Sequence, residues 1–589
     1  MRRCRFIVPA LLAACGIAAM MSWPAPAAAR APFRAPLADR IPSDAQMYFG
    51  WVGPVAKWPG YKTSNLHFVL SRTHIAKFIE GNLPVLLRKL NELPATHNTQ
   101  LNRAQFKTAI AVASLLITHS FAVYFRPIRT GIHHVAALPR AVLIMDAGKY
   151  PDAVLSLFKI LPHQLYPSGP RLSAGSVGPM VYVGIHITSG VRRALAGKGT
   201  TLATADRFCR SMRFMPAEPV AADFADLTSL RHYANTILNH ALSNPALRGT
   251  SHGRQQRIVF REAQVILNSR SLRNDTAFAS ADGFSGAQWV ETSFLAMRHA
   301  SIKKVSGAAD MLTLAPEHSP AVTVSHLNLK AFVTTTKKTI EATSPQIRRN
   351  VRQVLTLING ITGVDMEKDV INAFGPYWLT YQSADMPMSS ALGTVVVNRL
   401  AHPERLARAL QTLTPMALLA VNAAMRQRGY TGTPAQLEIL HAHGAVIYYI
   451  KANGIMPAWA IVHGYLYFSA YPHPIQLALG RKVSEPSILD NKKFMALQRQ
   501  LGCTHDYTNA GYVDQPRLLS DTYHMITTEA AAYSLLLGLQ FDPPISALIP
   551  RLSDLQKATT TSGFVTWTDK AGWHSRSISG YPGSSLFVP

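Results

Sequence analysis

The chain of 589 residues holds 59 Lys and Arg against 32 Asp and Glu, which gives a formal net charge of +27, and 48% of its residues are hydrophobic. This composition excludes an intrinsically disordered chain. The length exceeds what one hydrophobic core usually serves, so we expect at least two domains. The excess of basic over acidic residues favours an anionic partner.

The N-terminus has the pattern of a secretion signal. Three arginines among the first five residues precede an apolar run, and small residues at 27–29 supply a cleavage site. We therefore predict a signal peptide over residues 1–29 and a linker over 30–40. Two alternatives stay open: a transmembrane anchor, for which the apolar run is short, and a lipid anchor on Cys15, which ends a lipobox-like Leu-Ala-Ala-Cys sequence.

An exported chain is expected to meet envelope polyanions rather than nucleic acid. The predicted location is the periplasm or the exterior, and the predicted partners are an anionic envelope polymer, such as lipopolysaccharide or an anionic glycan, or lipid headgroups. An alternative is that the basic charge reflects adaptation to an acidic exterior. No later stretch offers about 18 uninterrupted apolar residues, so we predict no transmembrane span in the mature chain.

Two cysteines, Cys209 and Cys503, remain once the predicted signal is removed. An oxidising compartment permits a disulfide between them, and two free thiols are the alternative.

Taken in chain order, the first half alternates strand and helix patterns, beginning with an entry strand and ending in a hairpin that turns at Asp282-Gly283. Its predicted strands are 44–51, 121–125, 140–145, 180–185, 199–205, 277–280 and 289–297, and its predicted helices are 73–93, 106–117, 151–161 and 224–242, with an exposed loop over 247–256.

The second half repeats much of this series. Its predicted strands are 322–324, 376–381, 391–397, 437–440, 445–450, 458–462, 464–470, 510–513, 563–567 and 573–579, and its predicted helices are 329–342, 347–358, 403–428, 487–501, 518–536 and 545–555. A proline opens the helix after the second strand pair in each half, at Pro151 and Pro403.

The order of these matches predicts an internal repeat. Met145 and Val397 share one spacing with Pro151 and Pro403, and a second constant spacing matches strands 180–185 and 199–205 with 446–450 and 464–470. We predict an α+β protein of two tandem related domains, 41–300 and 309–589, joined by a linker over 301–308. Each domain is expected to be a mainly antiparallel sheet with helices packed on one face. The alternative is two unrelated α+β domains with similar series.

Catalytic and metal-binding patterns are weak. Ser156-Leu-Phe-Lys159 and Ser301-Ile-Lys-Lys304 match the S-x-x-K nucleophile motif, but no K-T-G strand follows. His441 and His443 have strand spacing that would point both rings to one face, but no nearby acid or cysteine completes a metal site. We predict no catalytic residue, no cofactor and no metal.

Carboxylates gather at helix starts, where they complement the helix dipole. Asp365, Glu367 and Asp369 lie together in this way, and Asp152 and Glu404 follow the helix-opening prolines. A glycosidase would need two carboxylates facing each other across a cleft, and the sequence gives no such pairing.

Tyrosines concentrate on adjacent predicted strands of the second half. Tyr448, Tyr465 and Tyr467 are therefore the predicted ligand face, on which a sugar or another flat ligand would stack. The alternative is that these rings belong to a half-buried sheet.

The entry segment 41–51, the strand pairs with proline-led helices and the segment 487–494 resemble a family of bacterial exported proteins catalogued as a domain of unknown function. The resemblance implies an envelope location and an α+β fold, and it implies no catalytic residues. We expect an exported envelope protein with a non-catalytic binding or structural role. The alternative is a hydrolase acting on an envelope polymer.

Overall fold

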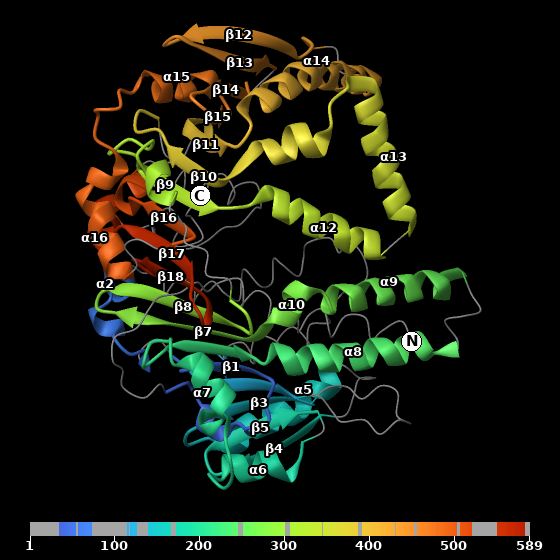
Figure 1. The fold of residues 1–589 in the computed structure, drawn as a ribbon. Coiled ribbons are helices and arrows are strands. Elements are labelled where there is room, and N and C mark those ends of the chain that lie inside the picture. The colour runs from blue at the N-terminus through green and yellow to red at the C-terminus, as the bar shows by residue number, and fades with distance from the viewer. Residues whose placement is uncertain are drawn as a thin grey trace.

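The computed structural model is a mixed helix and strand protein built on one large antiparallel sheet (Figure 1). It describes residues 34–54, 57–72, 115–116, 118–126, 140–165, 172–185, 187–245, 251–300, 307–343, 345–386, 391–429, 432–452, 456–502, 507–520, 523 and 551–582. The predicted signal peptide, most of the predicted helices over 73–117 and 518–550, Ser301 to Lys304 and Cys503 lie outside the described residues.

The strands pair in one unbroken series, and every pair is antiparallel. The series contains β4 (Ser173–Val177), β5 (Met180–Gly184), β3 (Arg140–Asp146), β2 (Phe121–Arg126), β1 (Met47–Trp51), β6 (Ala221–Ala225), β7 (Asp275–Ser285), β8 (Gln288–Met297), β18 (Gly572–Ser579), β17 (Ser562–Thr568), β16 (Asn509–Val513), β9 (Ala321–His326), β10 (Phe374–Gln382), β11 (Thr394–Leu400), β15 (Tyr465–Ser469), β14 (Ala458–Val462), β13 (Ala445–Lys451) and β12 (Gln436–Ala442).

The two halves of the chain use the same strand order. The first half runs β4-β5-β3-β2-β1-β6-β7-β8, and the second runs β14-β15-β11-β10-β9-β16-β17-β18. The halves meet where β8 pairs with β18. The sheet is therefore continuous, and the expectation of a separate sheet in each half is not met. The hairpin β12–β13, at one end of the sheet, has no counterpart in the described first half.

The register at this seam is that of a two-fold relation. Trp289 and Trp573 occupy matching positions of their hairpins, and at the same spacing Thr292 matches Arg576. Thr292 and Arg576 are also direct partners across the seam. A residue that faces its own counterpart lies on the axis of an isologous contact, as in a symmetric dimer.

The register predicted between the halves is wrong by one residue. Val142 and Ile144 of β3 match Val395 and Val397 of β11, because they face the equivalent tyrosines and partners on β2 and β10. Met145, which we had matched with Val397, points to the opposite face. A slip of one residue moves a strand's whole apolar set to the other side of a sheet.

The second predicted spacing is also wrong. The counterparts of β4 and β5 are β14 and β15, which form the hairpin next to β11. Residues 199–205 do not form a strand. They hold a short 3-10 helix, η4 (Leu202–Thr204), which leads into α7 (Asp206–Met212).

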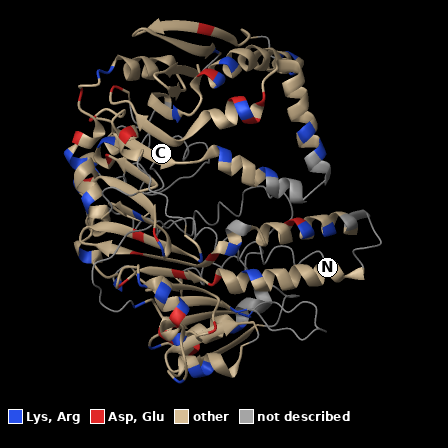
Figure 2. Ribbon diagram, viewed as in Figure 1, with Lys and Arg blue, Asp and Glu red and all other residues tan. Residues whose placement is uncertain are grey.

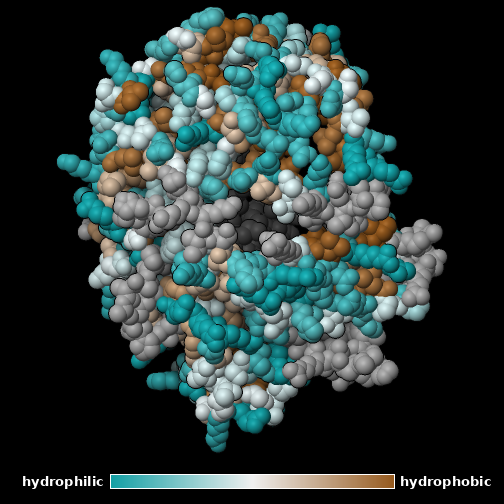
Figure 3. Space-filling view, in the orientation of Figure 1, coloured by the Kyte–Doolittle hydropathy of each residue, from teal (hydrophilic) through white to brown (hydrophobic). Residues whose placement is uncertain are grey.

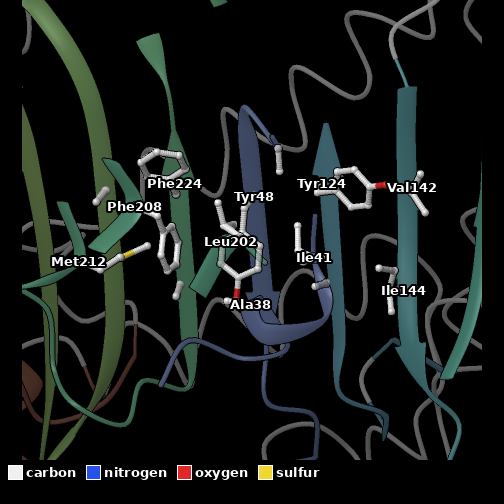
Figure 4. Packing of buried hydrophobic residues seen from close by; sticks show 14 of the residues in the cluster. Ala38, Ile41, Tyr48, Tyr124, Val142, Ile144, Leu202, Phe208, Met212 and Phe224 are labelled. Carbon is white, nitrogen blue, oxygen red and sulfur yellow. The ribbon is translucent and has the colours of Figure 1, made fainter. Parts of the chain in front are cut away.

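Helices cover both faces of the sheet, so the prediction of helices on one face is wrong. In the first half, η1 (Ala38–Arg40), α6 (Ser189–Leu195), η4 and α7 pack on one face, and α5 (Pro151–Leu165) packs on the other. Figure 4 shows the first of these cores, in which the rings of Tyr48, Phe208 and Phe224 lie together on one face of the strands. Alternate side chains of β3 point to opposite faces of the sheet, so Ile144 packs in one core and Met145 in the other.

The equivalent core of the second half is built by α11 (Ala308–Leu312), η9 (Ile488–Asp490) and α16 (Lys492–Leu501). Phe208 and Phe494 hold the same place in the two cores. Each makes an edge contact with a ring on the neighbouring strand, Phe224 at 5.3 Å and Tyr512 at 5.7 Å. The residue immediately before each phenylalanine also matches. Before Phe208, Arg207 forms an ion pair with Asp226, with Nη1 and Oδ2 2.6 Å apart.

Lys493 and Asp514 form the corresponding ion pair in the second half, at 2.8 Å. In both halves the acidic residue of this ion pair directly follows a strand, β6 or β16, and that strand pairs with the first strand of its half. The two halves thus share a packing core, a ring contact and an ion pair at matching positions.

Long helices extend from one side of the sheet (Figure 1). They are α8 (Leu227–Ser243), α9 (Ser251–Leu267), α12 (Leu329–Thr343), α13 (Pro345–Thr362) and α14 (Pro403–Gln427); the remaining described helices are η3 (Tyr61–Thr63), α2 (Asn65–Arg72), α10 (Arg270–Asn274), η6 (Met366–Val370), η7 (Ile371–Ala373), η8 (Ala391–Gly393), α15 (Pro472–Gly480) and α19 (Leu552–Ala558). The predicted loop over 247–256 is wrong from Ser251 on, where α9 begins. Within the described residues no helix is both long and apolar enough to cross a bilayer.

The hairpin that ends the first half turns at Gly286-Ala287 rather than at the predicted Asp282-Gly283. Asp282 and Gly283 lie inside β7, opposite Glu291 and Val290. The Asp-Gly pair is a strong turn signal, but here the strand continues because both residues pair with β8.

Candidate functional site

A pocket of about 480 Å³ lies in the second half, between the first turns of α14, the strands β12 to β14 and the turns that follow β12 and β14. Its lining is mostly apolar and aromatic, with a few polar groups. The lining residues are Pro403, Glu404, Ala407, Leu410, Gln411, Leu437, Gly444, Ala445, Val446, Tyr448, Trp459, Ile461, Val462 and His463. A volume of this size and a lining of this kind are typical of small-molecule sites.

Two tight hairpins shape the strands beneath the pocket. The turn His443-Gly444 joins β12 to β13, and His463-Gly464 joins β14 to β15. All four residues have positive φ, at 52°, 75°, 51° and 83° in chain order. Two positive values in a two-residue loop define the turn that fits the twist of a hairpin, with glycine at the second position. These turns fix which side chains face α14.

A row of apolar side chains crosses the outer strands, and its two middle members line the pocket. Ile439, Tyr448, Trp459 and Phe468 are successive direct partners on β12, β13, β14 and β15. The rings of Tyr448 and Trp459 are stacked, with centroids 5.9 Å apart and planes 18° apart. The row is buried at Trp459 and exposed at its ends, where Ile439 is 54% and Phe468 is 44% exposed. Ring faces in such a row suit a flat ligand.

The wall of the pocket is the first part of α14. Pro403 opens this helix and Glu404 lies in its first turn, as the sequence predicted. Leu406 packs with Leu400 and the partly buried Leu466 in a small core that holds the helix on the sheet. That packing turns Glu404, Ala407 and Gln411 toward the pocket.

Two basic residues lie in the same turns of α14 and outside the pocket lining. Arg405 and Arg408 are exposed, and the Arg408 guanidinium donates to the Glu404 carbonyl oxygen at 3.4 Å. Figure 2 shows that Lys and Arg are spread over both halves of the molecule, so these two arginines are a local part of a generally basic surface. An anionic ligand would meet positive charge on this part of the surface.

The structure separates the three tyrosines of the predicted ligand face. Tyr448 lines the pocket, but Tyr465 and Tyr467 lie on the opposite face of the sheet, where they pack against the core of the second half. The two faces alternate along β15, and the exposed ring on that strand is Phe468. Burial raises the pKa of Tyr467, which fits a packed ring rather than a solvent-facing one.

The other motifs of the sequence do not converge. Ser156 lies inside α5 and donates to the Asp152 carbonyl oxygen at 2.8 Å, which is ordinary bonding within a helix. His441 is in β12 but His443 is in the turn, so the strand spacing predicted for the two rings is wrong. Asp365 caps η6 by accepting from two backbone N–H groups, as its position predicted.

No group of three His, Cys, Asp or Glu in the described part of the chain is arranged to hold a metal ion. Cys209 is an exposed free thiol.

A second polar cluster, which the sequence did not indicate, lies on the sheet near the seam. Asp282 faces Glu291 directly, and Asp223 is one strand away. Ser577 donates to the Glu291 carboxylate at 2.9 Å, and Ser280 donates to Asp223 at 2.9 Å. Burial raises the pKa of Asp223 to about 6, and burial with the neighbouring acids raises the pKa of Asp282 well above its usual range. These side chains stabilise one another only if some of them keep a proton.

Comparison with protein-family models, with curated proteins and with solved structures found no match. The function is therefore argued from the site alone. Of the pocket residues, the sequence had indicated Tyr448 as a ligand residue and Glu404 as a helix-start acid. Trp459 was missed, although its alternation along β14 with the small residues Ala458 and Ala460 was a usable signal.

Proposed function

We propose that the protein is an exported bacterial envelope protein that binds an anionic glycan, without catalysis, in the pocket between α14 and β12–β14. The observation that carries the proposal is the stacked pair Tyr448 and Trp459, which line an apolar pocket beside a helix that carries exposed arginines. Sugar rings present apolar faces to aromatic side chains, and their hydroxyls bond polar groups such as Glu404, Gln411 and His463.

The position of the pocket supports a binding role. Much of it is built from β12 and β13, which only the second half has among the described strands, and the helix α14 forms its wall. Segments added to a shared framework commonly carry function.

The make-up of the pocket supports binding over hydrolysis. Among the described residues its lining holds one carboxylate, Glu404, and one imidazole, His463. Glycoside hydrolysis usually needs two carboxylates on opposite sides of the bond that is cleaved. The buried acids near the seam, Asp282 and Glu291, belong to the sheet and line no part of this pocket.

The proposal includes the origin of the fold. We infer two tandem related domains that arose by duplication of one α+β unit, with the kinship to the exported family of unknown function as part of the same inference. The shared strand order supports it, as do the matching rings Phe208 and Phe494 and the matching ion pairs of Arg207 and Lys493.

Filling the pocket should abolish glycan binding. Ala407→Trp places an indole in the pocket from the α14 wall, and we expect the affinity for purified lipopolysaccharide to fall at least tenfold in isothermal titration. Ala423→Trp, on an exposed turn of the same helix, is the matched control and should bind like the wild type. An equal loss of affinity in both variants, or no loss in either, would show that the glycan does not bind in the pocket.

Analysis of the same protein and lipopolysaccharide mixtures for released fragments separates binding from hydrolysis. We expect no release of sugar or lipid fragments on prolonged incubation. Fragment release that Glu404→Gln abolishes would replace the binding proposal with a hydrolase.

The exposed arginines of the first turns of α14 should supply the charge selectivity. In Arg405→Gln/Arg408→Gln, binding of lipopolysaccharide should weaken several-fold at low salt and depend less on salt concentration, because exposed charges are screened by salt. The control is a neutral glycan, dextran, whose weaker binding should be the same in both proteins. An unchanged salt dependence would show that these arginines do not contact the ligand.

A further inference from the structure

Strand β12 lies at one end of the sheet and, among the described strands, pairs only with β13. Figure 1 shows β12 at the top of the molecule, and Figure 3 shows hydrophobic residues at the surface in that region. Ile439, in the middle of β12, is 54% exposed, and Gln436 and His441 are also exposed. The outer edge of this strand is therefore open to a partner.

The backbone groups that face outward from this edge belong to alternate residues. The Ile450 N–H of β13 donates to the Pro457 carbonyl oxygen at 2.9 Å, on the side of β13 away from β12. Leu437 is the partner of Ile450 on β12, so it turns its own N–H and C=O outward. By alternation, Ile439 and His441 do the same. Within the described residues no hydrogen bond reaches these outward groups.

A side chain of α14 bonds the chain just before this edge. The Asn422 amide donates to the Ala435 carbonyl oxygen at 2.9 Å, and its oxygen accepts from the Ala435 N–H at 2.8 Å. Ala435 stands two residues before Leu437, so its bonded groups point to the same outward side. Asn422 thus takes the place of a strand partner at Ala435, and the seven residues of β12 are left for another chain.

Strand β12 lacks the features that usually block the edge of a sheet. It contains no Lys, Arg or Pro, and its register with β13 is unbroken over all seven residues. Its one carboxylate, Glu438, points to the face opposite Ile439. At the other end of the sheet, β4 is shorter and contains Gly175, which weakens a strand. An unblocked edge is a template for pairing with a further strand.

We propose that two copies of the chain pair antiparallel through β12 and form a two-fold dimer with one continuous sheet. Ile439 is the middle residue of the strand, so full overlap places it opposite Ile439 of the second copy. Leu437 then pairs with His441 of the second copy, and every outward backbone group of the strand gains a partner. The contact also covers the exposed Ile439 side chain with an equal apolar side chain.

The register selects a second copy of the chain as the partner. A strand that overlaps its own copy in full forms a closed, isologous contact, and no other segment is needed to complete it. The fold already contains a contact of this kind, since β8 and β18 pair antiparallel with Thr292 opposite its counterpart Arg576. Pairing of β12 with β4 of another copy would be open-ended, and β4 is too short to match β12.

Dimerisation would place both pockets on the same side of the enlarged sheet. The two-fold axis of such a strand pair is perpendicular to the sheet, so the equivalent faces of the two copies point the same way. Leu437 lines the pocket, and Ile439 lies on the same face. A repeating anionic glycan would then meet two pockets at once, which raises its apparent affinity. This consequence rests on the proposed function, whereas the dimer itself does not.

Sedimentation velocity of the full chain, with no lipid or glycan present, tests the contact. We expect a dimer for the wild type at micromolar concentration in about 0.15 M salt, where the short Debye length limits the repulsion between two chains of net charge +27. Ile439→Lys should raise the dissociation constant about tenfold or more, because it sets like charges opposite each other on the axis. Ile439→Glu should do the same. An equal mixture of the two variant proteins should recover the dimer, since opposite charges then meet.

Proline substitutions give an independent test of the backbone pairing. Ile439→Pro removes an outward N–H and no bond to β13, so it should abolish the dimer and leave the circular dichroism spectrum unchanged. Ser176→Pro is the matched control, at an exposed position of the edge strand β4 whose N–H faces away from β5. This control should dimerise like the wild type.

A monomeric wild type would overturn the proposal, and so would a dimer that persists in Ile439→Lys and Ile439→Pro. Failure of the mixed Ile439→Lys and Ile439→Glu proteins to associate would show that Ile439 does not face its own counterpart. Assemblies that grow beyond the dimer with concentration would identify an open series of contacts instead. Because no glycan is present, a failed glycan titration leaves these results unchanged.

Discussion

Phe494→Ala should lower the free energy of unfolding by about 3–5 kcal/mol, the usual cost of removing a buried phenylalanine. The ring is 2% exposed and lies in the core of the second half, in edge contact with Tyr512. Because the surrounding strands belong to a continuous sheet, we expect little collapse around the cavity. The measurement is the midpoint of urea unfolding followed by circular dichroism.

The internal repeat supplies the comparison. Phe208, also 2% exposed, has the same place in the first half, so Phe208→Ala should cost a similar amount. Phe468→Ala, at a ring 44% exposed, should cost less than about 1 kcal/mol. A large loss for one of the buried rings and a small loss for the other would contradict the equivalence of the two cores.

Asp223→Asn should stabilise the protein at neutral pH and remove part of its pH dependence. Burial raises the pKa of this carboxyl from 3.8 to about 6, so the folded state holds the proton more tightly than the unfolded state. The stability contributed by this group is therefore complete below about pH 4, declines as the pH rises from about 4 to 6, and is lost above that window. The shift corresponds to about 2–3 kcal/mol.

Urea unfolding between pH 3.5 and 7.5 measures this effect. The wild type should lose stability across the window, and Asp223→Asn should lose less, because the amide stays neutral and can still accept the Ser280 hydrogen bond. Asp385→Asn, at an exposed position, is the control and should follow the wild type. Identical slopes for Asp223→Asn and the wild type would show that folding does not raise the pKa of the Asp223 carboxyl.

Local patterns predicted most of the elements. Alternation and proline-led helix starts placed β2, β3, β10 and α14 within a few residues, since both signals depend on neighbours in the chain. The pairing of β8 with β18 could not be predicted from local patterns, because it joins strands that are almost half the chain apart in the sequence. The register between the halves failed for a related reason: Ile144 and Met145 are both apolar, so the sequence does not say which of them faces the larger core.

The site was predicted in part. Aromatic enrichment led to Tyr448, but the sequence could not say that Trp459 would lie beside it. That depends on the strand pairing set by the short turns at His443-Gly444 and His463-Gly464. The same turns put Tyr465 and Tyr467 on the far face. A ligand face spread over several strands can be read only once the register is known.

The fluorescence of Trp459 tests the central claim most directly. The emission change caused by lipopolysaccharide is measured for the wild type and for Trp459→Phe, which keeps a ring in the stack. If the pocket is the binding site, most of the emission change should disappear in the variant while the affinity falls only modestly. An undiminished change in Trp459→Phe would mean that the ligand binds elsewhere, and the proposed function would be wrong.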